Sequence, residues 1–193
     1  MTAPIPTRES TTPPVDIEEH VFRPLTPEDD TFALRMFNAY QDPAFASQRA
    51  NPSARLAAPD SFHALTHHLS LYILALRHDE PQLAAAAYAQ IVDYYARTGH
   101  SASPFRLEYV YDHTEGPNKL RAYLAESAAA RLVSCGGKSG NASRSSFVGM
   151  GGVQVVVGPE VAVSKSMRDV VAKGGDLAVD LFAAVVKLSV DAK

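Results

Sequence analysis

Apolar residues recur every three or four positions along most of this chain, which is the period of amphipathic α-helices. The pattern is clearest after Ser61, a residue type that caps helix N-termini. A helix is predicted there, and its main apolar stripe consists of Phe62, Leu65, Leu69, Tyr72, Ile73 and Leu76. Leu71 and Leu74 lie on the opposite side of that helix, so we expect it to be covered on two faces.

Capping residues and helix breakers divide the chain into further helices. A helix is predicted from Pro27 to Tyr40, because Thr26 can cap it and Pro27 suits its first position. Prolines recur too often between 41 and 60 for a long regular element, so this segment is predicted to be a loop. Three more helices are predicted to run from Pro81 to about Thr98, from Pro104 to the turn at 114–117, and from there to Gly136–Gly137.

The C-terminal part of the chain has a different composition. Residues 134–146 are rich in Gly and Ser and are predicted to be a flexible linker. β-Branched residues on both sides of a Gly158–Pro159 turn are compatible with a small β-hairpin near 153–163. A short helix is predicted near 166–173, and a second from Asp176 to Leu188, where ten of thirteen residues are apolar. Because its charges form one narrow stripe, we expect this last helix to be mostly buried, against its own domain or a partner.

These elements together predict a mainly α, compact multi-helix domain. Residues 1–16 are rich in Thr, Pro and Ser, and we expect them to form a disordered tail. The helical region then spans 17–133, and the hairpin and helices of 147–193 are expected to pack on the same domain. Hydrophobic residues make up 46% of the chain, which is ample for a core.

Charge and cysteine content narrow the range of partners and compartments. The net charge is −3, and 18 basic residues are scattered among 21 acidic ones, so we expect no nucleic-acid partner. The apolar window 177–186 is broken by Asp180 and is shorter than the ~20 residues that span a bilayer, so we expect no membrane partner. The N-terminus lacks the apolar core of a secretory signal. Cys135 is the only cysteine, which rules out an intrachain disulfide and favours the reducing cytoplasm or nucleus.

Two histidines have the spacing of a metal site. His63 and His67 are one helical turn apart, but the chain reads His63-Ala-Leu-Thr-His67, without the glutamate of a zinc-protease helix. A third ligand would have to come from His20, His78 or His113. We favour the interpretation that His63 and His67 are polar-face residues of an otherwise apolar helix.

The remaining motifs do not form a catalytic or cofactor site. Lys138-Ser139 follows a glycine, but a phosphate-binding loop would need a further glycine where the chain has Leu132. Gly149-Met-Gly151-Gly152 precedes the predicted strand, whereas a dinucleotide-binding loop follows one. Cys135 has no base placed near it by sequence. We therefore predict no catalytic residue, no metal and no cofactor.

Several stretches, taken in order, resemble the C-terminal half of fungal BTB/POZ-domain proteins. Asp30 to Tyr40 resembles the family segment in which a helix ends in a WLYTG pattern, and His67 to Leu83 is similar to its LYVLADKYDIPAL helix-turn-helix. Tyr111 to Arg121 resembles a Y-x-x-T-x-G-P-x-x-L-R stretch of fungal members, and Gly174 to Leu181 resembles their C-terminal end. The resemblance covers about 28–133 and 167–188.

The resemblance implies a non-catalytic protein-protein interaction protein, an adaptor or scaffold whose partners include a second copy of itself. The family's N-terminal half, which holds its usual dimer and cullin-contacting regions, has no counterpart before residue 28. The expected Tyr-Thr-Gly ending is Tyr40-Gln41-Asp42 here. Two alternatives stay open: a small metal-dependent enzyme that uses His63 and His67, and a truncated family member without retained function.

Overall fold

The part of the chain that the computed structural model describes is helical, and it contains no strand. It comprises residues 26–44, 49, 51–137 and 163–191, with the side chains of 134–137 and 191 left out. The α-helices are α1 (Thr31–Gln41), α2 (Phe62–Arg77), α3 (Pro81–Thr98), α4 (Pro104–His113), α5 (Lys119–Gly137), α6 (Lys165–Ala172) and α7 (Gly175–Asp191). Short 3₁₀ helices are η2 (Pro27–Asp29) and η4 (Pro52–Ala54). The predicted mainly α class is confirmed.

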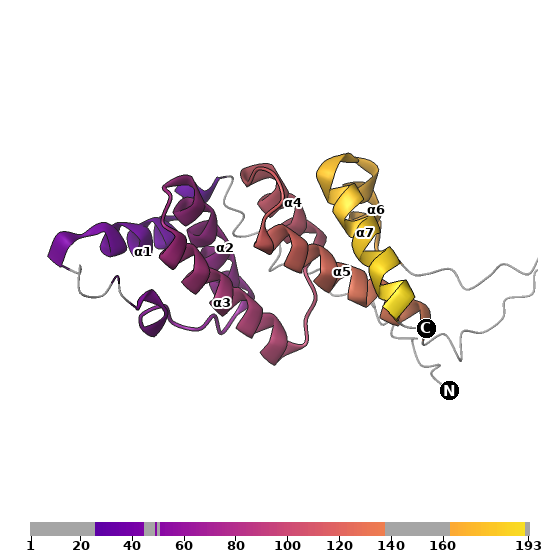
Figure 1. Cartoon of the computed structure of the whole chain (residues 1–193), viewed down its shortest axis with the longest axis horizontal. Coiled ribbons are helices and arrows are strands. Elements are labelled where there is room, and N and C mark those ends of the chain that lie inside the picture. The colour runs from indigo at the N-terminus through magenta and orange to yellow at the C-terminus, as the bar shows by residue number, and fades with distance from the viewer. Residues whose placement is uncertain (1–25, 45–48, 50, 138–162, 192–193) are drawn as a thin grey trace, which may run out of the picture.

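The helices lie in a row, with α1 at one end and the α6–α7 pair at the other (Figure 1). The two most extensive contacts join α2 to α3 and α5 to α7. α1 and η2 pack on α2, while α4 contacts α2, α5, α6 and α7. The C-terminal helices are therefore attached to the rest of the chain mainly through α4 and α5.

The first predicted helix is divided into two elements. Thr26 caps η2, and its backbone N–H donates to the Asp29 carboxylate at 2.9 Å in a capping box. Asp30 then leaves helical geometry, and its carboxylate accepts the backbone N–H of Ala33 at 3.0 Å. The prediction of one helix from Pro27 to Tyr40 was wrong, because Asp30 caps a new helix.

The other predicted helix ends agree with the structure. The Ser61 hydroxyl accepts the backbone N–H of Ala64 at 3.2 Å, so Ser61 caps α2. Pro81 and Pro104 open α3 and α4, and Gly99 ends α3 with a φ of +65°. Gly174 and Gly175 both have positive φ, and this pair reverses the chain between α6 and α7.

Helix α2 lies at the centre of the core. All its residues from Leu65 to Ala75 are buried except His67, which confirms that this helix is covered on two faces. Arg106 of α4 is fully buried against its first turn, with Nη2 donating to the carbonyl of Phe62 at 2.6 Å and the guanidinium 3.2 Å from the Phe62 ring centroid. A charged side chain is therefore held in the core by a carbonyl and an aromatic face.

Three predictions concern residues that the structure describes in part or not at all. The predicted disordered tail at 1–16 lies outside the described residues, and so does the predicted linker at 134–146 beyond Gly137. The prediction of a linker was wrong for 134–137, which form the end of α5. The predicted β-hairpin near 153–163 also lies outside the described residues, apart from Val163, which is in no strand. The helices near 166–173 and 176–188 are present as α6 and α7, and α7 extends further at both ends.

Replacing Leu69 with Asp should abolish cooperative folding. Leu69 is fully buried in α2, and a buried carboxylate without a partner costs well over the roughly 2–5 kcal/mol of a large-to-small core substitution. Leu76→Asp in the same helix is the matched control, because Leu76 is 42% exposed. We expect it to retain a cooperative thermal transition by circular dichroism; equal behaviour of the two variants would contradict this assignment of the core face.

Candidate functional site

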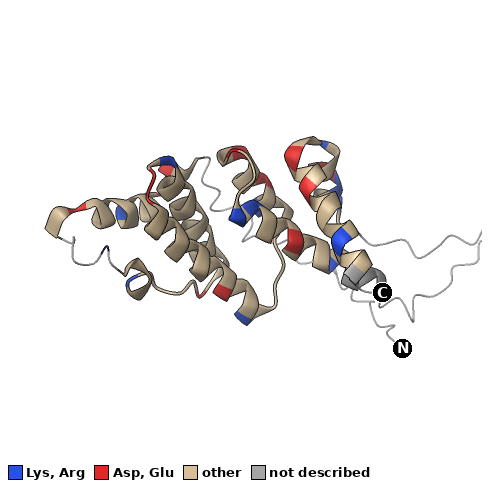
Figure 2. Cartoon of the chain, viewed as in Figure 1, with Lys and Arg blue, Asp and Glu red and all other residues tan. Residues whose placement is uncertain are grey.

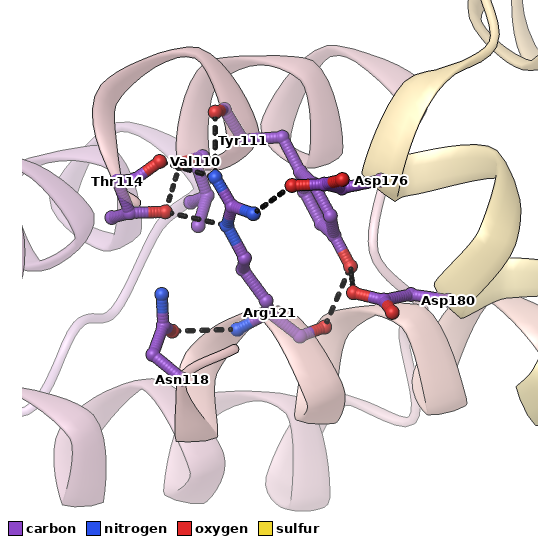
Figure 3. A network of polar contacts seen from close by, with 7 residues as sticks. All are labelled: Val110, Tyr111, Thr114, Asn118, Arg121, Asp176 and Asp180. Carbon is purple, nitrogen blue, oxygen red and sulfur yellow. Dashed lines mark hydrogen bonds and ion pairs between the residues drawn. The ribbon is translucent and has the colours of Figure 1, made fainter. Parts of the chain in front are cut away.

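The turn between α4 and α5 is closed by the side chain of Arg121, which is 4% exposed (Figure 3). Its Nε donates to the Thr114 hydroxyl at 2.8 Å, and Nη2 donates to the carbonyl of Tyr111 at 3.0 Å and to that of Thr114. The Thr114 hydroxyl in turn donates to the carbonyl of Val110 at 2.6 Å. Carbonyls at the end of a helix have no partner within that helix, and here one guanidinium supplies donors.

Two further contacts fix the position of Arg121. The Asn118 side-chain oxygen accepts the backbone N–H groups of Leu120 and Arg121, both at 3.0 Å, and so caps the start of α5. The guanidinium also lies 4.5 Å from the centroid of the Tyr111 ring. Arg121 thus joins the end of α4 to the first turn of α5.

The same group of residues holds α7 (Figure 3). Arg121 Nη1 donates to Asp176 at 3.1 Å, and the Tyr111 hydroxyl donates to Asp180 at 2.7 Å. Burial of Tyr111 and its bond to the Asp180 carboxylate raise the pKa of the phenol well above its usual range. Further along, Lys187 donates to Glu126 of α5 at 2.8 Å. The narrow charged stripe of the last helix is therefore turned toward α4 and α5.

An apolar seam lies beside this charged stripe. Leu177, Leu181 and Ala184 of α7 are 5–6% exposed and belong to the same core cluster as Leu124 and Ala128 of α5. The seam explains why α5 and α7 make one of the two most extensive helix contacts of the described chain. Apolar burial and the polar contacts around Arg121 together fix the rotation of α7 about its own axis.

The other side of α7 is apolar and exposed. Val179, Phe182, Val186 and Val190 are 66, 71, 45 and 66% exposed and follow one another at intervals of three, four and four, so they form a single stripe. We call these four residues the outer face of α7. Three of them are the most exposed large hydrophobic side chains among the described residues. This last helix was expected to be mostly buried against its own domain or a partner. Its own domain does not bury it, because α5 covers only one of its two apolar sides, and burial by a partner stays a prediction.

The two histidines with metal-ligand spacing have separate environments. His67 Nδ1–H donates to the Asp30 carboxylate at 2.7 Å, whereas His63 lies on the exposed surface of α2. Burial by itself would raise the pKa of Asp30, but the bonds from His67 and the Ala33 N–H outweigh it and hold that pKa below its usual value. Within the described ranges, no group of three His, Cys, Asp or Glu side chains is placed to hold a metal.

The neighbouring polar side chains are also engaged in the core. Ser70 is fully buried, and its hydroxyl shares a 2.9 Å hydrogen bond with that of Tyr109. His68 Nε2–H donates to the carbonyl of Ala57 at 2.9 Å, and burial lowers the pKa of this histidine. These contacts join α2 to α4 and to the loop before α2. The polar groups of His68 and Ser70 thus stabilise the packing of the core.

An apolar hollow of about 210 Å³ lies at the other end of the row, between α1, η4 and α3. Met36, Tyr40, Leu56 and Leu83 are among its lining residues. Small-molecule sites usually enclose roughly 300–1,000 Å³, so this hollow is better matched to one or two apolar side chains than to a cofactor.

Charge does not single out any other surface. Basic and acidic residues are scattered over the described helices and do not gather on one of them (Figure 2). None of the described helices combines the length and apolarity needed to cross a membrane. The outer face of α7 is thus the surface feature that most needs an explanation.

Sequence reasoning found part of this site. It identified the charged stripe of Asp176, Asp180 and Lys187, but not the partners that the stripe contacts. Tyr111 and Arg121 had been named only as parts of a motif, and the structure brings them together with Asp180, which is far away in sequence. The sequence feature that could have indicated their contact is the placement of Tyr111 and Arg121 on either side of the Gly116–Pro117 turn.

Replacing Arg121 with Ala should destabilise the fold by about 2–4 kcal/mol, because the carbonyls of Tyr111 and Thr114 lose the donors that this buried side chain supplies. Asp176→Asn is the control: the Asp176 side chain is 75% exposed, so its ion pair with Arg121 should contribute under about 1 kcal/mol. Urea unfolding of both variants measures these losses. Equal losses would mean that the ion pair, and not the contact with the carbonyls, carries the effect.

Alkaline pH should weaken the attachment of α7. A raised pKa means that the folded chain holds the Tyr111 proton more tightly than the unfolded chain, whose tyrosines ionise near about pH 10. This contribution to stability is fully present below about pH 10 and is lost as the pH rises further. Tyr111→Phe should be less stable at neutral pH but should lose less stability above pH 10, as measured by urea unfolding across a pH series.

The control for this pH experiment is the wild-type chain, for which the free energy of unfolding is plotted against pH in the same way. Burial also raises the pKa of Tyr95 and of Tyr109 to about 12, so part of the alkaline loss should persist in the Tyr111→Phe variant. If the free energy of unfolding fell equally steeply above pH 10 in both proteins, the whole loss of stability would be assigned to Tyr95 and Tyr109.

Comparison with known proteins gives no relative for this architecture: no family model, no curated protein and no solved structure matches the chain.

Proposed function

We propose that this chain is a non-catalytic interaction protein, an adaptor or scaffold related to the C-terminal half of fungal BTB/POZ-domain proteins. It binds a protein partner through the outer face of α7. The observation that carries this proposal is the exposure of Val179, Phe182, Val186 and Val190 in one stripe on a helix whose opposite side is anchored. Contiguous exposed apolar stripes of this kind mark interaction sites in folded proteins.

The anchoring of α7 supports a binding role for its outer face. A partner that binds a helix already fixed in place does not have to order that helix first, so less of the contact energy is lost. Asp180 and Asp176 tie the start of α7 to Tyr111 and Arg121, and Lys187 ties its later turns to Glu126. The outer face is therefore presented in one orientation.

The resemblance to BTB/POZ-domain proteins agrees with this proposal at specific residues. Tyr111, Thr114 and Arg121 are the defining polar positions of the Y-x-x-T-x-G-P-x-x-L-R pattern, and all three take part in the network between α4, α5 and α7. The pattern then has a structural role, which is to set the position of the binding helix.

In the proposed role the polar groups of the core are structural. His67 is paired with Asp30, and Ser70 with Tyr109, so these side chains hold helices together. The single cysteine of this sequence favours a reducing compartment, the cytoplasm or nucleus, as the place of action.

Phe182→Glu should remove partner binding while leaving the fold intact, because Phe182 is 71% exposed and contributes little to the core. The wild-type chain, Phe182→Glu and Leu76→Glu are each immobilised and used to capture proteins from a cell extract, with quantification by mass spectrometry. We expect partners that are retained by the wild type and by Leu76→Glu but lost with Phe182→Glu. Identical captured sets for all three baits would contradict the proposed surface.

A further inference from the structure

We infer that the outer face of α7 is covered by the same face of a second copy of this chain, with the two α7 helices packed antiparallel. This inference rests on the function proposed above and names the partner. It is drawn from the charges that border the outer face, from the sizes of the side chains within it, and from the direction of the helix.

The first argument is that the outer face carries no charge. The charged side chains of α7 that the structure describes are Asp176, Asp180 and Lys187, and each contacts α4 or α5. The positions between the large outer residues are Ala178, Ala183, Val185 and Ser189. A partner with charged groups at this surface would bury them without counter-charges, which is costly. A second outer face presents only apolar and small side chains and avoids that cost.

The second argument is that large and small residues alternate in a way that suits two-fold pairing. A two-fold axis placed midway between Phe182 and Val186 sets Phe182 of each copy against Val186 of the other. The same axis sets Val179 beside Ser189 of the other copy, so a large side chain meets a small one. Interfaces between identical chains are usually of this isologous kind.

The third argument concerns direction. Asp176 and Asp180 lie in the first half of α7 and Lys187 in the second half, all on one flank of the outer face. In an antiparallel pair the same flanks of the two helices face each other and run in opposite directions. The acidic half of one copy then borders Lys187 of the other, and the positive end of each helix dipole lies beside the negative end of its neighbour. A parallel pair has neither attraction.

The size of the face sets the expected affinity. The outer face is one stripe along a single helix, which is less than the ~800 Å² per partner of a typical stable complex. We therefore expect a dimer that dissociates on dilution. α7 lies at the end of the row of helices (Figure 1), and the four residues of its outer face are exposed, so a second chain can reach them.

The first test is sedimentation velocity with light scattering on the full chain over about a hundredfold range of concentration. The wild type should pass from monomer to dimer as concentration rises. Phe182→Glu should weaken this dimer by roughly thirtyfold or more, because it places two like charges in the centre of the interface. Leu76→Glu replaces an exposed hydrophobic residue of α2 and should dimerise like the wild type. A wild type that stays monomeric throughout overturns the inference.

A second test determines direction. In a Cys135→Ser background, Ala183→Cys lies next to the predicted axis and should form an intermolecular disulfide under mild oxidation. Ser189→Cys should not, because its two copies are separated by about three helical turns in the antiparallel pair. Rapid cross-linking at both positions would indicate parallel helices, and cross-linking at neither would mean that α7 does not pair with itself.

Binding of a hydrophobic dye separates failure of this inference from failure of the proposed function. A monomeric wild type that binds anilinonaphthalene sulfonate, with the dye signal lost in Phe182→Glu, would overturn self-pairing but keep the outer face as a surface for a different protein. A monomeric wild type with the same dye signal as Phe182→Glu would overturn both proposals.

Discussion

One buried guanidinium determines how the C-terminal half of the described chain is assembled. Arg121 donates to two carbonyls at the end of α4, to the Thr114 hydroxyl, and to Asp176 at the start of α7. The last carbonyls of a helix have no partner within that helix, and here the buried side chain of Arg121 supplies donors to two of them. Because Arg121 lies in the first turn of α5, its contacts fix the angle between α4 and α5 and connect both helices to α7.

The attachment of α7 has a consequence for the surface of the protein. α7 is apolar on two sides, and its charged stripe contacts α4 and α5, which fixes the rotation of the helix about its own axis. That rotation buries Leu177 and Leu181 and leaves Phe182 and Val179 in solvent. The exposed stripe is thus a direct result of the polar network, and the candidate binding surface depends on residues that never touch it.

The N-terminal half of the row is held by different means. Helix α2 is buried on nearly all sides, and its polar groups bond to Asp30, Ala57 and Tyr109. These bonds engage histidine and serine side chains, which are residue types that can serve in catalysis or metal binding. The polar side chains of this half therefore stabilise the packing of α2 against its neighbours.

The sequence by itself determined the helices of the described chain and most of their ends, since periodicity and caps such as Ser61 and Gly99 act within a few residues. It missed the break at Asp30, where a local cap competes with a longer helix. It also showed that α7 is apolar apart from one narrow charged stripe, but it could not say which part of that apolar surface the rest of the chain would cover. Only the tertiary structure decided that, because the choice depends on Tyr111 and Arg121 meeting a helix that lies more than fifty residues further along the chain.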